Sequence, residues 1–353
     1  MSISRSLCTT ACSLVTVLLL GCFTPPWLTA QGVAISHAFA ESSPNFFWPV
    51  PAIARKNGPA IVGISNMSAG LYDQDEEQGT GSGVIIDAAQ GYVVTNYHVV
   101  EGAKTLQVSL SDGRTVAGRL LGSDARSDLA VVQIPASGLT AATLGNSGTM
   151  EVGELVVAIG NPLGDEFART VTHGIVSAVD RLLEIDEVRL KVIQIDAPIN
   201  PGNSGGGLFN VRGELIGINS AKVSLPGVEG MGFAIPIDTA RPIIQQLIEQ
   251  GSVQRPWLGI EGFTVSALVS EYYGLPQGVL VRRVTPDSPA AQAGVRRGDI
   301  ITGINEKTIT SIATLTEELA KRQVGDPVSV TLFRKGQTAT VSAVLANLPP
   351  ELR

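Results

Sequence analysis

Cysteine is nearly absent from this chain of 353 residues. The three cysteines, Cys8, Cys12 and Cys22, all lie in an apolar N-terminal segment, and the rest of the sequence has none. A disulfide framework and a cysteine-ligated metal site are therefore excluded beyond residue 22.

Basic residues are also fewer than acidic ones. The 25 lysines and arginines are outnumbered by 32 acidic residues, which gives a formal net charge of −7. A nucleic-acid-binding surface is basic and clustered. The composition therefore argues against a nucleic-acid partner, and we interpret the arginine pairs at 282–283 and 296–297 as solvated side chains.

Charge of either sign is missing between Arg5 and Glu41, and this gap contains the longest apolar run. Residues 7–23 are apolar and about long enough to cross a bilayer. Arg5 precedes the run and the next basic residue is Arg55, so the positive-inside rule predicts that the body of the protein lies outside the cytoplasm. We expect residues 1–40 to form an uncleaved membrane anchor.

Two alternatives for this segment remain open. The sequence AFA at 38–40 resembles a signal-peptide cleavage site, although it lies far beyond the apolar run. The sequence LLGC ending at Cys22 resembles a lipoprotein modification site. All three interpretations place the body of the protein outside the cytoplasm.

Glycine and proline, by contrast, are abundant, with 39 and 20 residues. This composition is typical of a turn-rich β protein. From Pro59 to about Pro236, short β-branched runs are broken by glycine, and they fall into two groups on either side of residues 138–150. We predict two β-barrels, followed by an amphipathic helix over Ile237–Gly251 that ends the domain.

Histidine is scarce, which narrows the search for a general base. The three histidines are His37, His98 and His173. His37 lies before the β-rich region, whereas His98 ends an apolar run and His173 lies in an alternating strand. A carboxylate that orients such a base should be buried. Asp128 opens an apolar strand, while Asp124 is better suited to cap a turn, and spacing alone leaves both candidates open.

The sequence INPGNSGGG at 199–207 places Ser204 among four glycines. Such a segment lets backbone N–H groups, here those of Gly202 and Ser204, converge on a carbonyl oxygen that becomes an oxyanion. Removing one donor of this kind costs roughly 3–4 kcal/mol of transition-state stabilisation. A Cβ atom at position 202, 205 or 206 is expected to obstruct this backbone path.

In the order His98, Asp128, Ser204, these segments resemble the HtrA family of trypsin-like serine proteases, and the resemblance covers residues 53–346. The layout is most similar to the DegS- and AlgW-like members, which have one membrane segment and one PDZ domain. The matching segments are IARKNGPAIVGI, GTGSGVIID, GYVVTNYHVV, SDLAVVQI, VVAIGNPLG, QIDAPINPGNSGGGLFN, GELIGIN and GFAIP.

The resemblance implies that His98 is the general base, Asp128 its orienting carboxylate and Ser204 the nucleophile. It also implies an oxyanion hole formed by the backbone of Gly202, Asn203 and Ser204, and a reaction that needs no metal or cofactor. At Gly207 many relatives carry proline or alanine, and we interpret this departure as a local difference in flexibility.

The specificity pocket is predicted from the residues next to the nucleophile and the strand that follows it. None of them is acidic, so we expect a small or medium aliphatic residue before the cut rather than a basic one. The predicted pocket residues are Ile199, Asn200, Ile218, Asn219 and Ser220.

The last part of the chain, from RPWLGI at 255–260 through GDIITGIN, resembles a PDZ domain. PDZ domains bind a C-terminal peptide as an extra strand beside a helix. We predict one clear helix over 314–322. The predicted peptide-binding residues are Arg255 for added charge, Leu258, Gly259 and Ile260 for carboxylate-binding N–H groups, and Leu315 and Leu319 for the groove.

In DegS-like relatives, a peptide on the PDZ domain activates the protease, and Arg181 matches their sensing arginine; the alternative is a solvated loop arginine. The short acidic stretch 71–79 favours a simple trimer over a large cage. It is interpreted as a solvated loop rather than a calcium site. Phe46, Phe47 and Trp48 are candidate trimer contacts or membrane-interface residues.

The sequence thus predicts a mainly β, chymotrypsin-like double barrel followed by an α+β PDZ domain. The resemblance implies a PDZ-regulated serine endopeptidase on the periplasmic side of a bacterial inner membrane, which cleaves a membrane-bound anti-sigma factor. The alternatives are a soluble periplasmic quality-control protease and a peptide-binding chaperone with an idle protease body. The expected division is 1–40 anchor, 41–58 lead-in and trimer contact, 59–250 protease and 251–347 PDZ domain.

Overall fold

The structure is a computed structural model, and some predicted features lie outside the residues it describes. These features are the apolar N-terminal segment, His37, the aromatic residues 46–48 and part of the acidic stretch. Within the described residues, no helix combines the length and the apolar character needed to cross a membrane. The described residues are 49–69, 75–161, 170–185, 188–200, 202–221 and 230–349.

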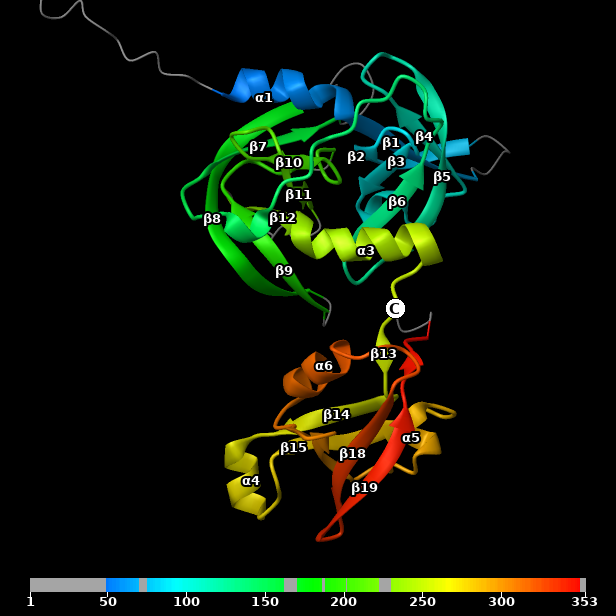
Figure 1. Cartoon of the computed structure of the whole chain (residues 1–353), viewed down its shortest axis with the longest axis vertical. Helices are drawn as coiled ribbons and strands as arrows, with labels where there is room; N and C mark the ends of the chain where they lie inside the picture. The colour runs from blue at the N-terminus through cyan, green and yellow to red at the C-terminus, as the bar shows by residue number, and fades with distance from the viewer. Residues whose placement is uncertain are drawn as a thin grey trace, which may run out of the picture. The chain divides into compact units, whose positions relative to one another are not determined.

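Two closed antiparallel barrels of six strands each follow one another along the chain (Figure 1). The first has the strand order β1-β2-β3-β6-β5-β4 and the second β10-β11-β12-β9-β8-β7. The predicted double barrel is therefore confirmed. The strands are β1 (Ile61–Ala69), β2 (Asp75–Asp87), β3 (Tyr92–Thr95), β4 (Thr105–Ser109), β5 (Thr115–Asp124), β6 (Leu129–Gln133), β7 (Leu155–Gly160), β8 (Thr170–Ile185), β9 (Val188–Ile195), β10 (Gly207–Phe209), β11 (Leu215–Asn219) and β12 (Gly232–Pro236).

Some strands are buried on both faces, which explains why their sequences are continuous apolar runs rather than alternating ones. In β3, Val93 packs inside the first barrel, while its neighbour Val94 packs in the core between the two barrels. In β6, Val132 likewise packs inside the first barrel and Val131 packs in the core between the barrels. The barrels therefore share one apolar core, and the site described below lies where they meet.

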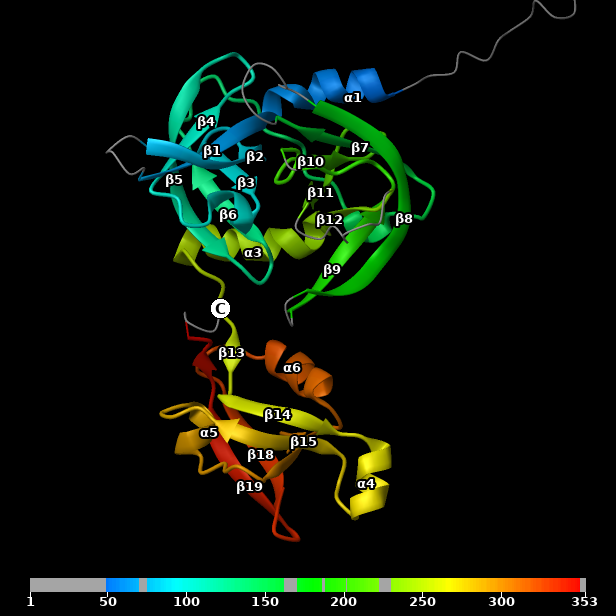
Figure 2. The same ribbon diagram turned by 180° about the vertical axis from the view of Figure 1, so that it is seen from behind.

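Two helices pack against the core that the barrels share, on opposite sides of the barrel pair, as Figure 2 shows from behind. The predicted helix is α3 (Ile237–Gln250), and it ends at Gly251 in the left-handed conformation with φ 72°, as expected. The other, α1 (Val50–Asn57), was not predicted because its segment begins with closely spaced prolines. Proline is well accommodated in the first turn of a helix, and α1 buries Val50 and Ile53.

The C-terminal domain has one sheet in the order β14-β15-β16-β18-β19, with its own apolar core. The predicted helix over 314–322 is α6, but it begins and ends two residues earlier because Ser311 caps it. The short helices α4 and α5 were not predicted. The elements are β13 (Pro256–Trp257), β14 (Ile260–Val265), α4 (Ala267–Tyr273), β15 (Gly278–Val284), α5 (Pro289–Gln292), β16 (Ile300–Ile304), β17 (Lys307–Thr308), α6 (Ile312–Ala320), β18 (Pro327–Arg334), β19 (Gln337–Val344) and β20 (Ala346–Asn347).

Candidate active site

A hydroxyl, an imidazole and a carboxylate lie in one hydrogen-bonded series where the barrels meet. His98 is carried by α2 (Tyr97–Val100), directly after β3, and Asp128 lies in the turn between β5 and β6. His98 Nδ1 lies 2.8 Å and 3.0 Å from the two carboxylate oxygens of Asp128. Its other ring nitrogen, Nε2, lies 2.9 Å from Ser204 Oγ, in the loop before β10. The structure therefore brings together the three residues that the sequence singled out.

The Asp128 carboxylate is buried, with 1% of its side chain exposed, and a buried polar group needs hydrogen-bond partners. Besides the imidazole, it accepts hydrogen bonds from the His98 backbone N–H at 3.2 Å and from Ser220 Oγ at 2.9 Å. Ser220 was predicted to line the specificity pocket. The structure instead directs its hydroxyl to the carboxylate that holds the imidazole.

Asn96 is a site residue that sequence reasoning missed. Its buried amide oxygen lies 2.9 Å from Ser204 Oγ, and its amide nitrogen donates to the Asp128 carbonyl oxygen at 2.9 Å. Asparagine is a favoured N-cap residue, yet Asn96 stands at the N-cap of α2 without capping it. A polar amide two residues before the candidate histidine, at the end of an apolar run, is the signal that could have identified it.

Glycine allows the loop around Ser204 to lie against both barrels. Gly205 has φ 82°, and a Cβ atom there would lie 2.2 Å from the Ser82 carbonyl oxygen. A Cβ atom on Gly206 would lie 2.2 Å from the Ile159 carbonyl oxygen. Gly207 has a different role from the flexibility we expected. It is buried in β10, where a Cβ atom would lie 2.6 Å from the Phe209 ring, so a larger residue there requires that ring to shift.

The predicted oxyanion donors differ in their availability. No described residue accepts a hydrogen bond from the N–H of Gly202 or Ser204. The Asn203 N–H, in contrast, donates to the Asn200 carbonyl oxygen at 3.2 Å. Of the three predicted donors, Asn203 is therefore already engaged, whereas Gly202 and Ser204 remain candidates for the hole.

The predicted specificity pocket also needs correction. Ile218 and Asn219 are completely buried, so neither can line an open pocket. Ile218 belongs to the core between the barrels, and the Asn219 amide donates to the Gly207 carbonyl oxygen at 3.2 Å. Ile199 is half-buried and Asn200 is exposed, so these two remain accessible to a substrate.

Asp124 and Arg255 form an ion pair that the sequence did not predict. Both guanidinium NH groups of Arg255 bind the Asp124 carboxylate, at 2.5 Å and 2.6 Å. Asp124 also accepts from the Ser127 N–H, which is the turn-capping role expected for it. Burial acts to raise the pKa of Asp124, but the hydrogen bonds and charge of Arg255 outweigh burial and hold that pKa below its usual value. Arg255 thus binds a side chain of the first barrel rather than adding charge to the peptide groove.

Two other candidates lie on β8. His173 is exposed and lies opposite Val157 of β7, while the imidazole bonded to Ser204 is that of His98. Arg181 is also exposed, opposite Val192 of β9, and it lies in a strand rather than in the expected loop. No described residue forms an ion pair with Arg181.

In the C-terminal domain, the N–H groups of Leu258 and Gly259 have no acceptor among the described residues. Carboxylate binding by a PDZ domain requires such unpaired donors, and Ile260, the third predicted donor, is the first residue of edge strand β14. Glycine at 259 also has a packing reason. Its φ is 91°, and a Cβ atom there would lie 2.1 Å from the Ser288 Cβ, so the glycine accommodates Ser288.

The two groove leucines on α6 lie in different environments. Leu315 is 5% exposed and belongs to the core of the domain, whereas Leu319 is half-buried beside that core. Leu319 is therefore accessible to a bound peptide and Leu315 supports the groove from within.

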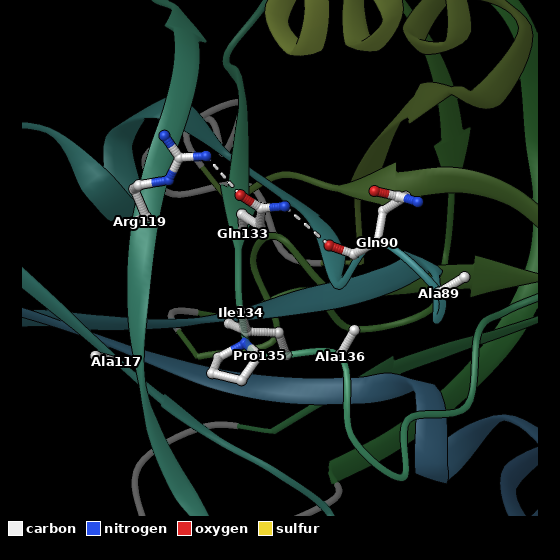
Figure 3. A pocket seen from close by; sticks show the side chains of 8 residues that line it. All are labelled: Ala89, Gln90, Ala117, Arg119, Gln133, Ile134, Pro135 and Ala136. Atoms are coloured by element: carbon white, nitrogen blue, oxygen red, sulfur yellow. Dashed lines mark hydrogen bonds between the residues drawn. The ribbon is translucent and has the colours of Figure 1, made fainter.

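A hollow of about 460 Å³ lies elsewhere, on the first barrel between β5, β6 and the turn after β2 (Figure 3). Arg119 donates there to Gln133, which in turn donates to the Gln90 carbonyl oxygen. No predicted site residue lines it. In the described part of the chain, no group of three or more His, Cys, Asp or Glu side chains could hold a metal ion.

A serine, histidine and aspartate series on a double β-barrel defines the class of trypsin-like serine endopeptidases. Comparison with known proteins supports the same class. The profile of the trypsin-like peptidase domain matches residues 81–218, and that of the PDZ domain matches residues 256–345.

Individual relatives extend the agreement to most of the chain. The serine protease Do-like HtrB of Bacillus subtilis is 43% identical over 82% of this chain and 69% of its own length. The periplasmic serine endoprotease DegP of Salmonella typhimurium is 43% identical over 82% of this chain, which spans only 61% of DegP. A solved structure of the HtrA-type protease AlgW with a decapeptide has a TM-score of 0.74 and 35% identity, over 85% of this chain and 99% of AlgW. The chain belongs to the HtrA family of serine proteases and carries one PDZ domain.

Proposed function

We propose that Ser204 is the nucleophile of this endopeptidase, with His98 as its general base and Asp128 as the carboxylate that orients the base. The observation that carries the proposal is the unbroken series of hydrogen bonds from Asp128 through His98 to Ser204 Oγ. Ser204 Oγ attacks the peptide carbonyl carbon while His98 Nε2 accepts the hydroxyl proton. His98 then protonates the leaving amine, and water hydrolyses the acyl-enzyme.

The negative oxygen of the tetrahedral intermediate is stabilised by the N–H groups of Gly202 and Ser204. Their lack of an acceptor among the described residues supports this role. The accessible residues beside them, Ile199 and Asn200, carry no charge, which supports cleavage after a small or medium aliphatic residue.

We propose further that a C-terminal peptide binds along β14 and activates the protease, with Arg181 as a sensing residue. The N–H groups of Leu258 and Gly259, which have no acceptor among the described residues, support peptide binding. Arg181 is exposed, and its guanidinium forms no ion pair with any described residue, which supports its role as a sensor. We expect partial activation, because a shift from about 1% to 99% active needs roughly 5.5 kcal/mol of differential binding, out of about 8 kcal/mol for a micromolar peptide.

The proposed setting is the periplasmic face of a bacterial inner membrane, where the protein acts as a trimer and cleaves a membrane-bound anti-sigma factor during envelope stress. The apolar run at 7–23 and the near-complete coverage of AlgW, 99% of that chain, support this assignment. Release of the protein from membranes without detergent would contradict the anchor. That result would favour the second candidate, a soluble periplasmic quality-control protease, which the similarity to DegP supports.

One experiment tests the catalytic assignment. The parent protein and Ser204→Ala are compared for cleavage of labelled casein, with and without a library of peptides that have free C-termini. We expect peptide-stimulated cleavage by the parent and none by the variant. Equal cleavage by both would overturn the role of Ser204. Peptide binding without cleavage by either would point to a peptide-binding chaperone.

A further inference from the structure

One fully buried hydroxyl near the site has no role in the proposed chemistry. It belongs to Ser82, which lies in β2 of the first barrel between Gly81 and Gly83. We propose that Ser82 is a positioning residue that fixes the oxyanion loop of the second barrel. This inference rests on the catalytic roles proposed above.

Every polar atom of Ser82 is engaged at this junction. Its N–H donates to the Ser204 carbonyl oxygen at 2.8 Å, and its Oγ donates to the Gly202 carbonyl oxygen at 2.5 Å. Ser82 Oγ accepts from the Asn161 N–H at 2.7 Å, and the Ser82 carbonyl oxygen accepts from Thr95 Oγ1 at 2.6 Å. Three of these four partners, all except Thr95, belong to the second barrel or its loops.

The two carbonyl groups that Ser82 binds lie on either side of the peptide that matters for catalysis. The Ser204 N–H belongs to the peptide between residues 203 and 204. The preceding peptide is held by Ser82 at the Gly202 carbonyl and by the bond from the Asn203 N–H to Asn200. The following peptide is held by Ser82 at the Ser204 carbonyl. Because its neighbours on both sides are fixed, the Ser204 N–H is oriented before substrate arrives, which is what an oxyanion donor requires.

The glycines around Ser82 explain how β2 comes so close. A Cβ atom on Gly81 would lie 3.2 Å from the Ser204 carbonyl oxygen, and one on Gly160 would lie 2.9 Å from Ser82 Oγ. Glycine at these positions leaves room between the strands for the side chain of Ser82.

The test separates positioning from general stability, because an oxyanion donor acts only in the transition state. In Ser82→Ala we expect kcat to fall roughly tenfold to a hundredfold with KM nearly unchanged, less than the hundredfold or more for complete loss of a donor. Binding of a peptide boronate, which forms a tetrahedral adduct with Ser204, is expected to weaken by a similar factor. Binding of a substrate peptide, measured in a Ser204→Ala background, is expected to stay the same.

Thr95→Val is the matched control, because it removes a buried hydroxyl whose hydrogen bond goes to the Ser82 carbonyl oxygen and not to Gly202 or Ser204. We expect it to lower the melting temperature while kcat and boronate affinity stay within about threefold of the parent. Equal losses in Ser82→Ala and Thr95→Val, or no change of either readout in Ser82→Ala, would overturn the inference. If Ser82→Ala does not fold, Ser82→Cys replaces the hydroxyl with a larger, weaker donor, and the same comparison decides.

Failure of the inference and failure of the proposed function are distinguishable. Ser204→Ala is assayed in parallel with the Ser82 variants. Full activity of Ser204→Ala would remove the proposed nucleophile whatever Ser82 does. An inactive Ser204→Ala beside a Ser82→Ala protein that matches the parent would remove only the positioning role.

Discussion

The two barrels contribute to the site by different means. The first supplies side chains, His98, Asp128 and Asn96, each fixed by specific hydrogen bonds. The second supplies a glycine-rich backbone on which Ser204 is the main reactive group. The imidazole and the carboxylate thus come from one barrel and the hydroxyl from the other. The difference leads us to expect that a substitution of His98 or Asp128 changes proton transfer, while one of Ser204 changes the attack itself.

The largest effect on kcat is expected when the Ser204 hydroxyl of the second barrel is removed. Ser204→Ala deletes the attacking oxygen, and we expect kcat to fall by about 10⁶-fold. Cleavage of labelled casein measures the loss. Affinity for a C-terminal peptide, measured by calorimetry, should match that of the parent. A loss of peptide binding as well would show that the variant is misfolded rather than inactive.

The next effect is expected from the first barrel. Asp128→Asn keeps the shape of the side chain and tolerates the positive φ of 53° at this position. It removes the charge that orients His98, so we expect kcat to fall by about 10⁴-fold. Asp112→Asn, in an exposed turn, is the matched control and should retain parental kcat. Equal kcat values for the two variants would contradict the assignment of Asp128.

A third effect concerns stability. Arg255→Ala leaves the buried Asp124 carboxylate without its cation, and we expect a loss of about 3 kcal/mol in the free energy of unfolding. Arg212→Ala, which breaks an exposed pair with Glu214, should cost under about 1 kcal/mol. Urea unfolding at neutral pH measures both.

The same ion pair predicts a pH dependence. The pKa of Asp124 is lower in the folded than in the unfolded state, so its contribution is present above the unfolded value, near 3.8, and is lost as the pH falls through the folded value. The stability difference between the parent and Arg255→Ala should therefore shrink below about pH 4. A constant difference from pH 7 to pH 3 would contradict this account.

The smallest effect on kcat is expected at Asn96, a side chain of the first barrel that lies against Ser204 of the second. Asn96→Ala removes the hydrogen bond to the Asp128 carbonyl oxygen and the polar contact with Ser204 Oγ, and we expect kcat to fall about tenfold, since about 1.4 kcal/mol corresponds to one factor of ten. Asn57→Ala is the control, because it removes a buried amide that bonds only within α1 and its end. Comparable kcat losses in both variants would assign Asn96 a structural role alone.

Sequence reasoning located the residues of the site better than it located their contacts. Ser204 was found because it stands in a glycine cluster, whereas His98 was chosen over His173 only through the resemblance to the HtrA family. Ile218 and Asn219 were misplaced because a strand next to a nucleophile can face either the pocket or the core, and only the barrel geometry decides. Arg255 and Asp124 are 131 residues apart, and neither segment contains a local pattern that predicts their ion pair.

Strand β14 has a consequence for the handling of this protein. It lies at the edge of its sheet, and no described strand pairs with its outer side. An uncovered edge offers unpaired N–H and C=O groups to any extended chain, including another copy of itself. A saturating peptide ligand should therefore slow aggregation of concentrated samples, even in an inactivated variant.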